Sequence, residues 1–419
     1  MRTDVIVVGA GASGLACARR LVLAGLGVTV LESRHRVGGR IHTYRPADGG
    51  PPLELGAQVV HGDRNPVHAL VGADRMVAVP RDVTARVVSG GVGHDMGLLA
   101  RGRRAPWLLE ALLRADPAPV GTGPDRAADV GSWLRAHGVR GEEDRAVREW
   151  FRQAWAAEPD ALDARGTAAA YRDDTVGHPV GDGEFAVAGG FDRLPALLAE
   201  GLDVRLGSPV HGLRFAPGRV EARTGDGTFR AAAAVVTVPP PVVGSGGLPI
   251  EDLPAAKLDA AKRLVLGDGC CAVAVLDRDA PETAVVFDVD GHGGFLRVAA
   301  GRPEVLVVAK AGAAAAVRAA AAERDGLLPL LRRALPWASS ARTTGVTVAD
   351  WGGDPWSRGA FTAPLTGAAD AAPAWAEPVD GTLFFAGEAT VSGSRLPWVH
   401  GALASGERAA EQTIEAISR

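Results

Sequence analysis

The first 32 residues contain short apolar runs separated by a glycine-rich segment. The apolar run Val5–Val8 is followed by glycines within residues 9–14 and then by apolar residues at helical spacing in Leu15–Leu21. A second apolar run, Val28–Leu31, ends at Glu32. This pattern predicts a strand, a loop, a helix and a second strand.

The glycines of this loop have the Gly-x-Gly-x-x-Gly spacing that suits a dinucleotide phosphate. Gly9 permits the tight turn, Gly11 lets backbone N–H groups approach a pyrophosphate, and Gly14 lets the helix pack closely on the strand. The N-terminus of the helix then faces the phosphate charge. Glu32 follows Gly14 by eighteen residues, where a carboxylate can accept hydrogen bonds from a ribose diol. The segment therefore predicts a dinucleotide-binding unit.

Farther along the chain, the apolar pattern changes from regular strand–helix alternation to a helical region and then to a strand-rich region. Residues 98–170 carry tryptophans at helix-like spacings, among them Trp107, Trp133, Trp150 and Trp155, which we expect in the core. Strands are expected at Gly189–Leu194, Leu202–Leu206, Val210–Phe215, Arg219–Ala222, Ala233–Pro239, Ala272–Leu276, Ala284–Phe287, Phe295–Val298 and Val305–Val308, and a helix at Ala313–Glu323.

The composition narrows the function classes. The 419 residues exceed one usual core, which predicts two domains, and 47% hydrophobic residues support extensive burial. The net charge of -4 and the absence of a basic run predict no nucleic-acid partner. Three cysteines form neither a disulfide framework nor a zinc spacing, so we expect no metal. No membrane anchor is evident, and we expect a cytoplasmic protein; whether it forms a homodimer stays open.

A second group of residues resembles FAD proteins of the glutathione-reductase type. Arg34 is followed by Val37–Ile41 and by Leu53–Gln58, which match the pattern of flavin amine oxidases and imply FAD rather than NAD. A second glycine pair before Arg40 lets that arginine reach the diphosphate from the side opposite the first loop. Taken alone, the pair also fits an ordinary turn.

The resemblance to flavin-dependent amine oxidases, which include monoamine oxidases, polyamine oxidases and lysine-specific histone demethylases, extends over essentially the whole chain. Further matches are Gly189-Gly190, the Ser208–Val210 turn, Thr237–Pro239, Trp351 and Gly387-Glu388. The resemblance implies FAD contacts from Gly9, Gly11, Ala12, Ser13, Gly14, Glu32, Arg34, Gly39, Arg40, Gly56, Ala57, Gln58, Val210, Trp351, Gly387, Glu388, Trp398 and Val399.

The same resemblance implies an α/β fold: a discontinuous glutathione-reductase-type Rossmann FAD-binding domain with an inserted α+β substrate domain. The FAD-binding domain would comprise residues 1–66, 186–246 and 378–419, and the substrate domain residues 67–185 and 247–377. The implied reaction is FAD-dependent oxidation of a small-molecule amine. Hydride passes from the amine α-carbon to flavin N5, the imine is hydrolysed, and dioxygen is reduced to hydrogen peroxide.

Family resemblance also implies an aromatic cage for the substrate. Phe361 and Trp398 match the two aromatics that flank the amine, and their electron-rich ring faces favour the substrate nitrogen. His61 resembles the histidine that lines the channel of polyamine oxidases, although it also fits a turn-capping role. Ala360 matches the position where some relatives bind the flavin through a cysteine, so FAD should be noncovalent.

One position departs from the family. Cys271 stands at the position where the family has a lysine, which holds a water beneath flavin N5 and assists reoxidation by dioxygen. The absence of this lysine puts fast oxidase turnover in doubt. A cation from elsewhere is the alternative, but Lys257 and Lys262 are expected on a helix.

Other reactions on the same fold remain open. An amino-acid oxidase would place an arginine where this chain has Val59, unless Arg64 substitutes for it. The absence of the lysine leaves a biosynthetic flavin dehydrogenase open. A carbon–carbon desaturase of the same fold also lacks the lysine, but the aromatic pair retained here argues against it. A noncatalytic carrier would have lost the flavin signature that this chain retains. The sequence identifies neither the amine nor the physiological electron acceptor.

Overall fold

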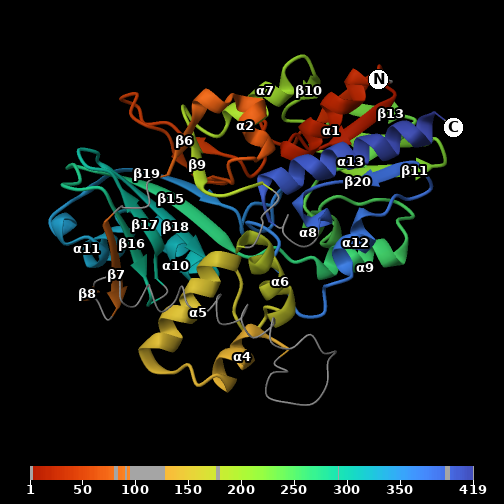
Figure 1. Ribbon diagram of the computed structural model, residues 1–419. Helices are drawn as coiled ribbons and strands as arrows, with labels where there is room; N and C mark the ends of the chain where they lie inside the picture. Colours follow the sequence, from red (N-terminus) through yellow and green to blue (C-terminus); the bar gives the residue numbers. More distant parts are fainter. Residues whose placement is uncertain are drawn as a thin grey trace.

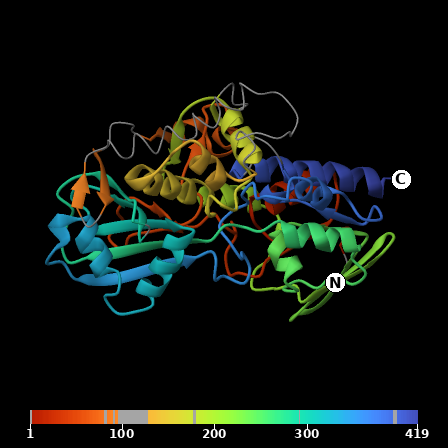
Figure 2. The ribbon, with the colours of Figure 1, turned by 90° about the horizontal axis from the view of Figure 1, so that it is seen from below.

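The computed structural model describes residues 3–79, 84–89, 92–94, 128–175, 180–290, 292–391 and 397–418. Figures 1 and 2 show two sheets toward opposite ends of the molecule, with the chain termini near each other at one end. Helices α4, α5 and α6 lie below the sheets in Figure 1. The predicted helical segment around Trp107 lies outside the described residues.

The first sheet is parallel and has five strands from distant parts of the chain. Its order is β10-β2-β1-β14-β20, with bounds β10 Asp203–Arg205, β2 Val28–Leu31, β1 Val5–Val8, β14 Ala233–Val236 and β20 Leu383–Phe385. Strands β1, β2, β14 and β20 are buried throughout. This burial explains their continuous apolar runs, because a parallel sheet is covered on both faces.

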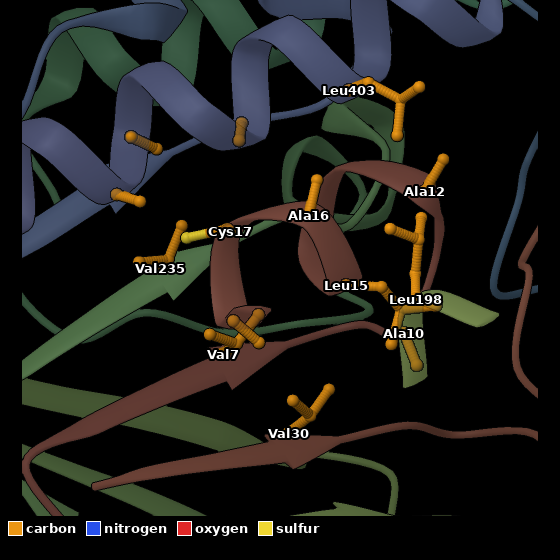
Figure 3. Packing of buried hydrophobic residues seen from close by; sticks show 14 of the residues in the cluster. Val7, Ala10, Ala12, Leu15, Ala16, Cys17, Val30, Leu198, Val235 and Leu403 are labelled. Carbon is orange, nitrogen blue, oxygen red and sulfur yellow. The ribbon is translucent and has the colours of Figure 1, made fainter. Parts of the chain in front are cut away.

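Helices cover one face of the parallel sheet. Helix α1 (Ala12–Leu23) lies beside α13 (Val399–Ile417), and α7 (Arg193–Ala199) packs into the same core. Figure 3 shows Cys17 of α1 pointing toward Val235, among the apolar side chains of this core. A Cβ on Gly406 of α13 would overlap the carbonyl oxygen of Ser13, so glycine permits the close approach of the two helices.

The other face of the parallel sheet carries a second core. A three-stranded antiparallel sheet packs there with three short helices. The elements are β11 Gly212–Ala216, β12 Arg219–Thr224, β13 Gly227–Ala231, α8 Pro240–Gly244, α9 Ala255–Arg263 and α12 Ala371–Ala376. Helices α9 and α12 pack here although they fall within the residues assigned to the substrate domain from the sequence.

The second large sheet has seven strands in the order β19-β15-β18-β17-β16-β7-β8. Its strands are β19 Thr343–Asp350, β15 Gly269–Leu276, β18 Glu304–Lys310, β17 Gly294–Val298, β16 Ala284–Asp288, β7 Thr84–Ser89 and β8 Val92–His94. Helices α10 (Gly312–Ala321) and α11 (Leu328–Ala334) cover one face, where Cys270 is buried. Because strand side chains alternate, Cys271 lies on the opposite face.

The remaining elements include a two-stranded sheet, β3-β4, a three-stranded sheet, β5-β9-β6, and a helical cluster of α4, α5 and α6. They are β3 Thr43–Tyr44, β4 Leu53–Glu54, β5 Val60–His61, β6 Met76–Ala78, β9 Glu184–Val187, α2 Pro66–Val71, α4 Val130–Ala136, α5 Gly141–Trp155, α6 Ala164–Thr175, and 3-10 turns at Ala73–Arg75, Pro336–Ala338 and Glu388–Thr390. None of the helices in the described ranges has the length and apolar character needed to cross a bilayer.

Most predicted strands occur close to their expected positions, but the strand at Gly189–Leu194 was wrong. Gly189 and Gly190 have φ angles of 79° and 104°, which an extended strand does not contain. They form a turn, and α7 begins at Arg193. The β13 strand was not predicted.

Candidate active site

A cavity of ≈ 1090 Å³ is lined by residues of both large sheets. The described wall includes the predicted residues His61, Cys271, Phe361 and Trp398. It also includes the predicted FAD contacts Gly9, Gly11, Ala12, Ser13, Glu32, Arg34, Gly39, Arg40, Gly56, Ala57, Gln58, Val210, Trp351, Gly387, Glu388 and Val399. Gly14 lies behind this wall, where α1 packs on β1. The fold therefore brings one set of predicted residues around one space.

The glycines of the first loop have different physical roles. Gly9 has a φ angle of 106°, and a Cβ there would lie 2.8 Å from the Thr237 hydroxyl oxygen. A Cβ on Gly14 would overlap the carbonyl oxygen of Gly9, so this position requires close helix–strand packing. A Cβ on Gly11 would meet no heavy atom within 4 Å. Gly11 thus opens the backbone toward the cavity, as a bound pyrophosphate requires.

Glu32 anchors the end of β2 beside this loop. Its side chain is buried and accepts hydrogen bonds of 2.8 Å from the backbone N–H groups of both Ala10 and Arg34. Arg34 is fixed in turn, because its guanidinium lies 2.5 Å from Asp354 and 2.8 Å from the Ser357 hydroxyl. The carboxylate of Glu32 is therefore oriented before any ligand arrives.

Arg40 and Glu388 form an ion pair across the cavity wall. Their side chains are 2.8 Å apart, and Arg40 also donates a 3.0 Å hydrogen bond to the carbonyl oxygen of Ala360. Gly56 lies directly against Arg40, because a Cβ there would overlap the Arg40 carbonyl oxygen. The indole N–H of Trp351 donates to the Leu55 carbonyl at 2.8 Å. These contacts tie the second glycine segment to the C-terminal part of the chain.

The aromatic end of the cavity contains a histidine and a lysine. The rings of His61 and Trp398 lie 4.0 Å apart at an interplanar angle of 50°. His61 lines the cavity, and its Nδ1 is 3.8 Å from a Glu184 carboxylate oxygen. The Nζ atom of Lys310 lies 5.1 Å from the centroid of the Phe361 ring. An ammonium group therefore lies over one of the two predicted cage aromatics.

Lys310 was missed by sequence reasoning and reaches the cavity from the strand next to Cys271. Strand β18 pairs with β15 so that Cys271 is opposite Val308, and Lys310 follows on the same face of the sheet. Burial lowers the pKa of Lys310 to about 8. Burial raises the pKa of the Cys271 thiol to about 11, so the thiol is uncharged at neutral pH.

The small number of lysines in the sequence could have pointed to Lys310. The chain has three lysines, and Lys310 directly follows a predicted strand. Lys257 and Lys262 lie on α9, as expected. The Nζ of Lys257 donates to the carbonyls of Ala374 and Trp375 at 2.9 and 2.7 Å, in the core beneath the parallel sheet. Neither of these two lysines lines the described cavity wall.

Two other expectations change at this wall. Trp133 is buried in the core, as predicted, and so is Trp155, although Trp155 also borders the cavity; Trp150 lines the cavity. Its ring lies 6.4 Å from that of Phe295, in an edge-on arrangement. Arg64, suggested as a substitute carboxylate ligand, is exposed and absent from the described wall, whereas Arg297 is part of it.

The glycine loop at Gly9–Gly14, here called the glycine cradle, lies beside the buried acid Glu32 and opens into the aromatic end of the cavity. Together these features define a dinucleotide-dependent enzyme that acts on a small molecule. A family model for flavin containing amine oxidoreductases matches residues 12–414. The chain belongs to this family, and it catalyses FAD-dependent oxidation of an amine. Its parallel sheet is the Rossmann-type FAD-binding part of that fold.

Individual relatives agree with this assignment. Polyamine oxidase 4 of Oryza sativa subsp. japonica is 30% identical over 452 residues, which cover 99% of this chain and 89% of the relative. Lysine-specific histone demethylase 1 homolog 2 of Arabidopsis thaliana is 30% identical over 451 residues, covering 98% and 58%. Putrescine oxidase bound to putrescine is similar in structure, with a TM-score of 0.78, 21% identity and full coverage of both chains. Cyclohexylamine oxidase from Brevibacterium oxydans IH-35A has a TM-score of 0.77 and 21% identity, also with full coverage.

Proposed function

We propose that the chain oxidises its amine at the aromatic end of the cavity, with FAD held noncovalently in the glycine cradle. The proposal depends mainly on the cavity, which joins the loop at Gly9 and Gly11 to the side chains of His61, Phe361 and Trp398. The open space at Gly11 and the oriented carboxylate of Glu32 fit a dinucleotide. Ala360 offers no thiol for a covalent bond to the flavin.

FAD, when bound, would accept the hydride that leaves the carbon next to the substrate nitrogen. Dioxygen would then take up the electrons and be reduced to hydrogen peroxide. In this proposal Phe361 and Trp398 hold the substrate and exclude water from the reacting carbon. His61 supports the ring of Trp398 through their 4.0 Å contact. The ion pair between Arg40 and Glu388 orients Arg40 beside the cofactor's diphosphate.

Lys310 replaces the positive charge that this chain lacks at Cys271. Its ammonium lies over Phe361 and is fixed by a 2.6 Å hydrogen bond to the Gln153 carbonyl. A cation in a water-poor cavity favours the negative charge that develops as dioxygen takes its first electron. Because the pKa of Lys310 is lowered to about 8, this charge is present at neutral pH and is lost at alkaline pH.

The domain division is also a proposal. Residues 1–66, 186–246 and 378–419 would form the FAD-binding domain, and residues 67–185 and 247–377 the substrate domain. The strands of the parallel sheet fall within the first set, and those of the seven-stranded sheet fall within the second. Because α9 and α12 pack on the parallel sheet, we place them with the FAD-binding domain.

Anaerobic mixing with monoamines, diamines, polyamines and amino acids tests the proposed reaction without requiring dioxygen. At least one class should bleach the flavin absorbance, and readmission of dioxygen should release hydrogen peroxide. Trp398→Ala should slow bleaching by that amine, whereas Trp398→Phe, which keeps a ring, should retain most of the rate. Absence of bleaching with every class would contradict the proposal.

Acid precipitation tests the noncovalent attachment separately. We expect all yellow colour in the supernatant, since position 360 is alanine. Colour that remains in the pellet would show a covalent bond and would refute this part of the proposal.

A further inference from the structure

Arg297 projects from β17 into the substrate part of the cavity without a direct partner. It lies opposite Leu306 of β18, on the sheet face that also carries Cys271 and Lys310. Within the described ranges its guanidinium makes no hydrogen bond or ion pair, and it is open to the cavity. A guanidinium has five N–H donors, so one that lines a cavity without a direct partner is suited to bind an anion.

The surrounding charges strengthen this preference for an anion. Arg297 and Lys310 are close enough to repel each other, which adds to burial in lowering the pKa of Lys310. Cys271 faces both cations and is uncharged, because burial raises its pKa. The acid that attracts Arg297 is Glu184, which is half exposed on β9 and lies 3.8 Å from His61. Arg297 and Lys310 are thus two mutually repelling cations, and among the described residues Glu184 is the one acid that acts on Arg297.

The surface beside Arg297 is aromatic. Phe295, two residues earlier on β17, stacks on Phe287 with ring centroids 4.8 Å apart. Trp150 of α5 meets these two rings edge-on at 6.4 and 6.5 Å. All three aromatic residues line the cavity. A ligand bound by Arg297 thus has an apolar surface for its carbon skeleton.

We propose that Arg297 binds a carboxylate of the substrate, and that the enzyme oxidises amines that carry a carboxylate and an apolar body. This inference rests on the proposed function, because it assumes that the amine is oxidised in this cavity. A guanidinium can hold a carboxylate through two parallel hydrogen bonds, whereas a diamine or polyamine would bring further positive charge toward Arg297 and Lys310.

Matched substrates separate recognition of the carboxylate from recognition of the amine. Each amino acid is compared with its carboxamide, which keeps the amine and the skeleton but removes the negative charge. Anaerobic flavin reduction gives an apparent Kd and a limiting rate for each compound. In the parent enzyme we expect the free acid to bind at least tenfold more tightly than the amide. Varying the number of carbons between amine and carboxylate identifies the preferred spacing.

Arg297→Leu should remove this difference. We expect the apparent Kd of the acid to rise about 10- to 100-fold, as for loss of a charged hydrogen bond, with little change for the amide. Arg297→Lys should restore part of the preference. Arg86→Leu is the matched control, because Arg86 also lines the cavity but lies 2.5 Å from Glu282. FAD content and melting temperature of each variant show whether it has folded.

A carboxylate without an amine gives a readout that does not need turnover. Benzoate should perturb the absorption spectrum of the oxidised flavin in the parent and in Arg86→Leu, but about tenfold more weakly in Arg297→Leu. Equal losses for acid and amide in Arg297→Leu would overturn the proposal, as would a parent that prefers amides or diamines to acids. If no amine of any kind bleaches the flavin, the proposed function itself fails.

Discussion

The two large sheets contribute to the cavity in different ways. The parallel sheet contributes a compact cradle, in which the loop at Gly9–Gly14 and the acid Glu32 follow each other closely in sequence. The seven-stranded sheet contributes single side chains from adjacent strands, among them Cys271, Arg297 and Lys310. A short sequence segment therefore forms the cradle, whereas the pairing register of adjacent strands determines which side chains form the substrate wall.

This difference has an energetic consequence. In the cradle, backbone atoms approach so closely that added atoms at Gly14 or Gly56 have no free space. On the substrate wall, Arg297 and Lys310 border open space, and a substitution there mainly changes the charge that a ligand meets. We therefore expect cradle substitutions to affect folding and FAD binding, and wall substitutions to affect specificity and rate.

The largest effect is expected for Gly14→Ala. Its Cβ would overlap the carbonyl oxygen of Gly9, so α1 must move away from β1, at a cost of about 3 kcal/mol in the free energy of unfolding. Urea unfolding and FAD content of the purified protein measure the change. Gly11→Ala is the matched control. Position 11 has a φ angle of -77° and free space for a Cβ, so this variant should fold normally yet retain less FAD.

Glu32→Ala should follow, with FAD binding weakened by about 1.5–3 kcal/mol through loss of a charged hydrogen bond to the ribose. The variant also leaves the N–H groups of Ala10 and Arg34 without their acceptor. Fluorescence titration of the apoprotein with FAD gives the Kd, and unfolding of the apoprotein measures the structural part. An unchanged Kd would show that Glu32 is not the ribose ligand.

Lys310→Met should slow the reaction of the reduced enzyme with dioxygen about tenfold, equivalent to about 1.4 kcal/mol of lost charge stabilisation. Stopped-flow measures this second-order rate separately from flavin reduction by substrate. In the parent the rate should fall as the pH rises through about 8, because Lys310 then loses its proton, and in the variant this dependence should disappear.

Adding Cys271→Lys to Lys310→Met should recover the rate, since position 271 faces the same cavity. Lys257→Met removes a lysine outside the cavity wall and should leave the dioxygen rate unchanged. Equal dioxygen rates in Lys310→Met and the parent would contradict the assignment. Cys270→Lys is unsuitable as a control, because Cys270 is buried beneath α10 and α11.

The smallest effect concerns stability and pH. The folded chain lowers the pKa of Lys310 to about 8, below the 10.5 of an ordinary lysine, so holding it charged costs free energy below pH 8. This cost is relieved between pH 8 and 10.5, where the folded chain releases the proton before the unfolded chain does. Lys310→Met removes this cost but also the hydrogen bond to the Gln153 carbonyl, so the variant should be more stable than the parent by a net of about 1 kcal/mol at pH 7, and the difference should shrink by pH 10.

Urea unfolding at both pH values measures that difference. Lys262→Met, which removes an exposed lysine, should show no such change between the two pH values. If the stability gained by Lys310→Met over the parent were larger at pH 10 than at pH 7, the proposed cost of holding Lys310 charged would be wrong.

Sequence alone determined the parts of the molecule in which a short segment specifies its own conformation. Glycines at positions 9, 11 and 14 predicted the loop because each has a distinct steric requirement, and the apolar runs predicted β1, β2 and β15–β18 near their observed positions. The same reasoning failed at Gly189–Leu194, where apolar residues follow two glycines with positive φ angles.

Only the tertiary structure decided which distant residues share the cavity. Lys310 meets Phe361 and lies beside Cys271 because β18 pairs with β15 in one particular register, and a shift by one residue would turn Lys310 toward α10. Arg297 reaches the same wall from β17 through its pairing with β18. The sequence contains all these side chains, but strand pairing decides which of their charges act together.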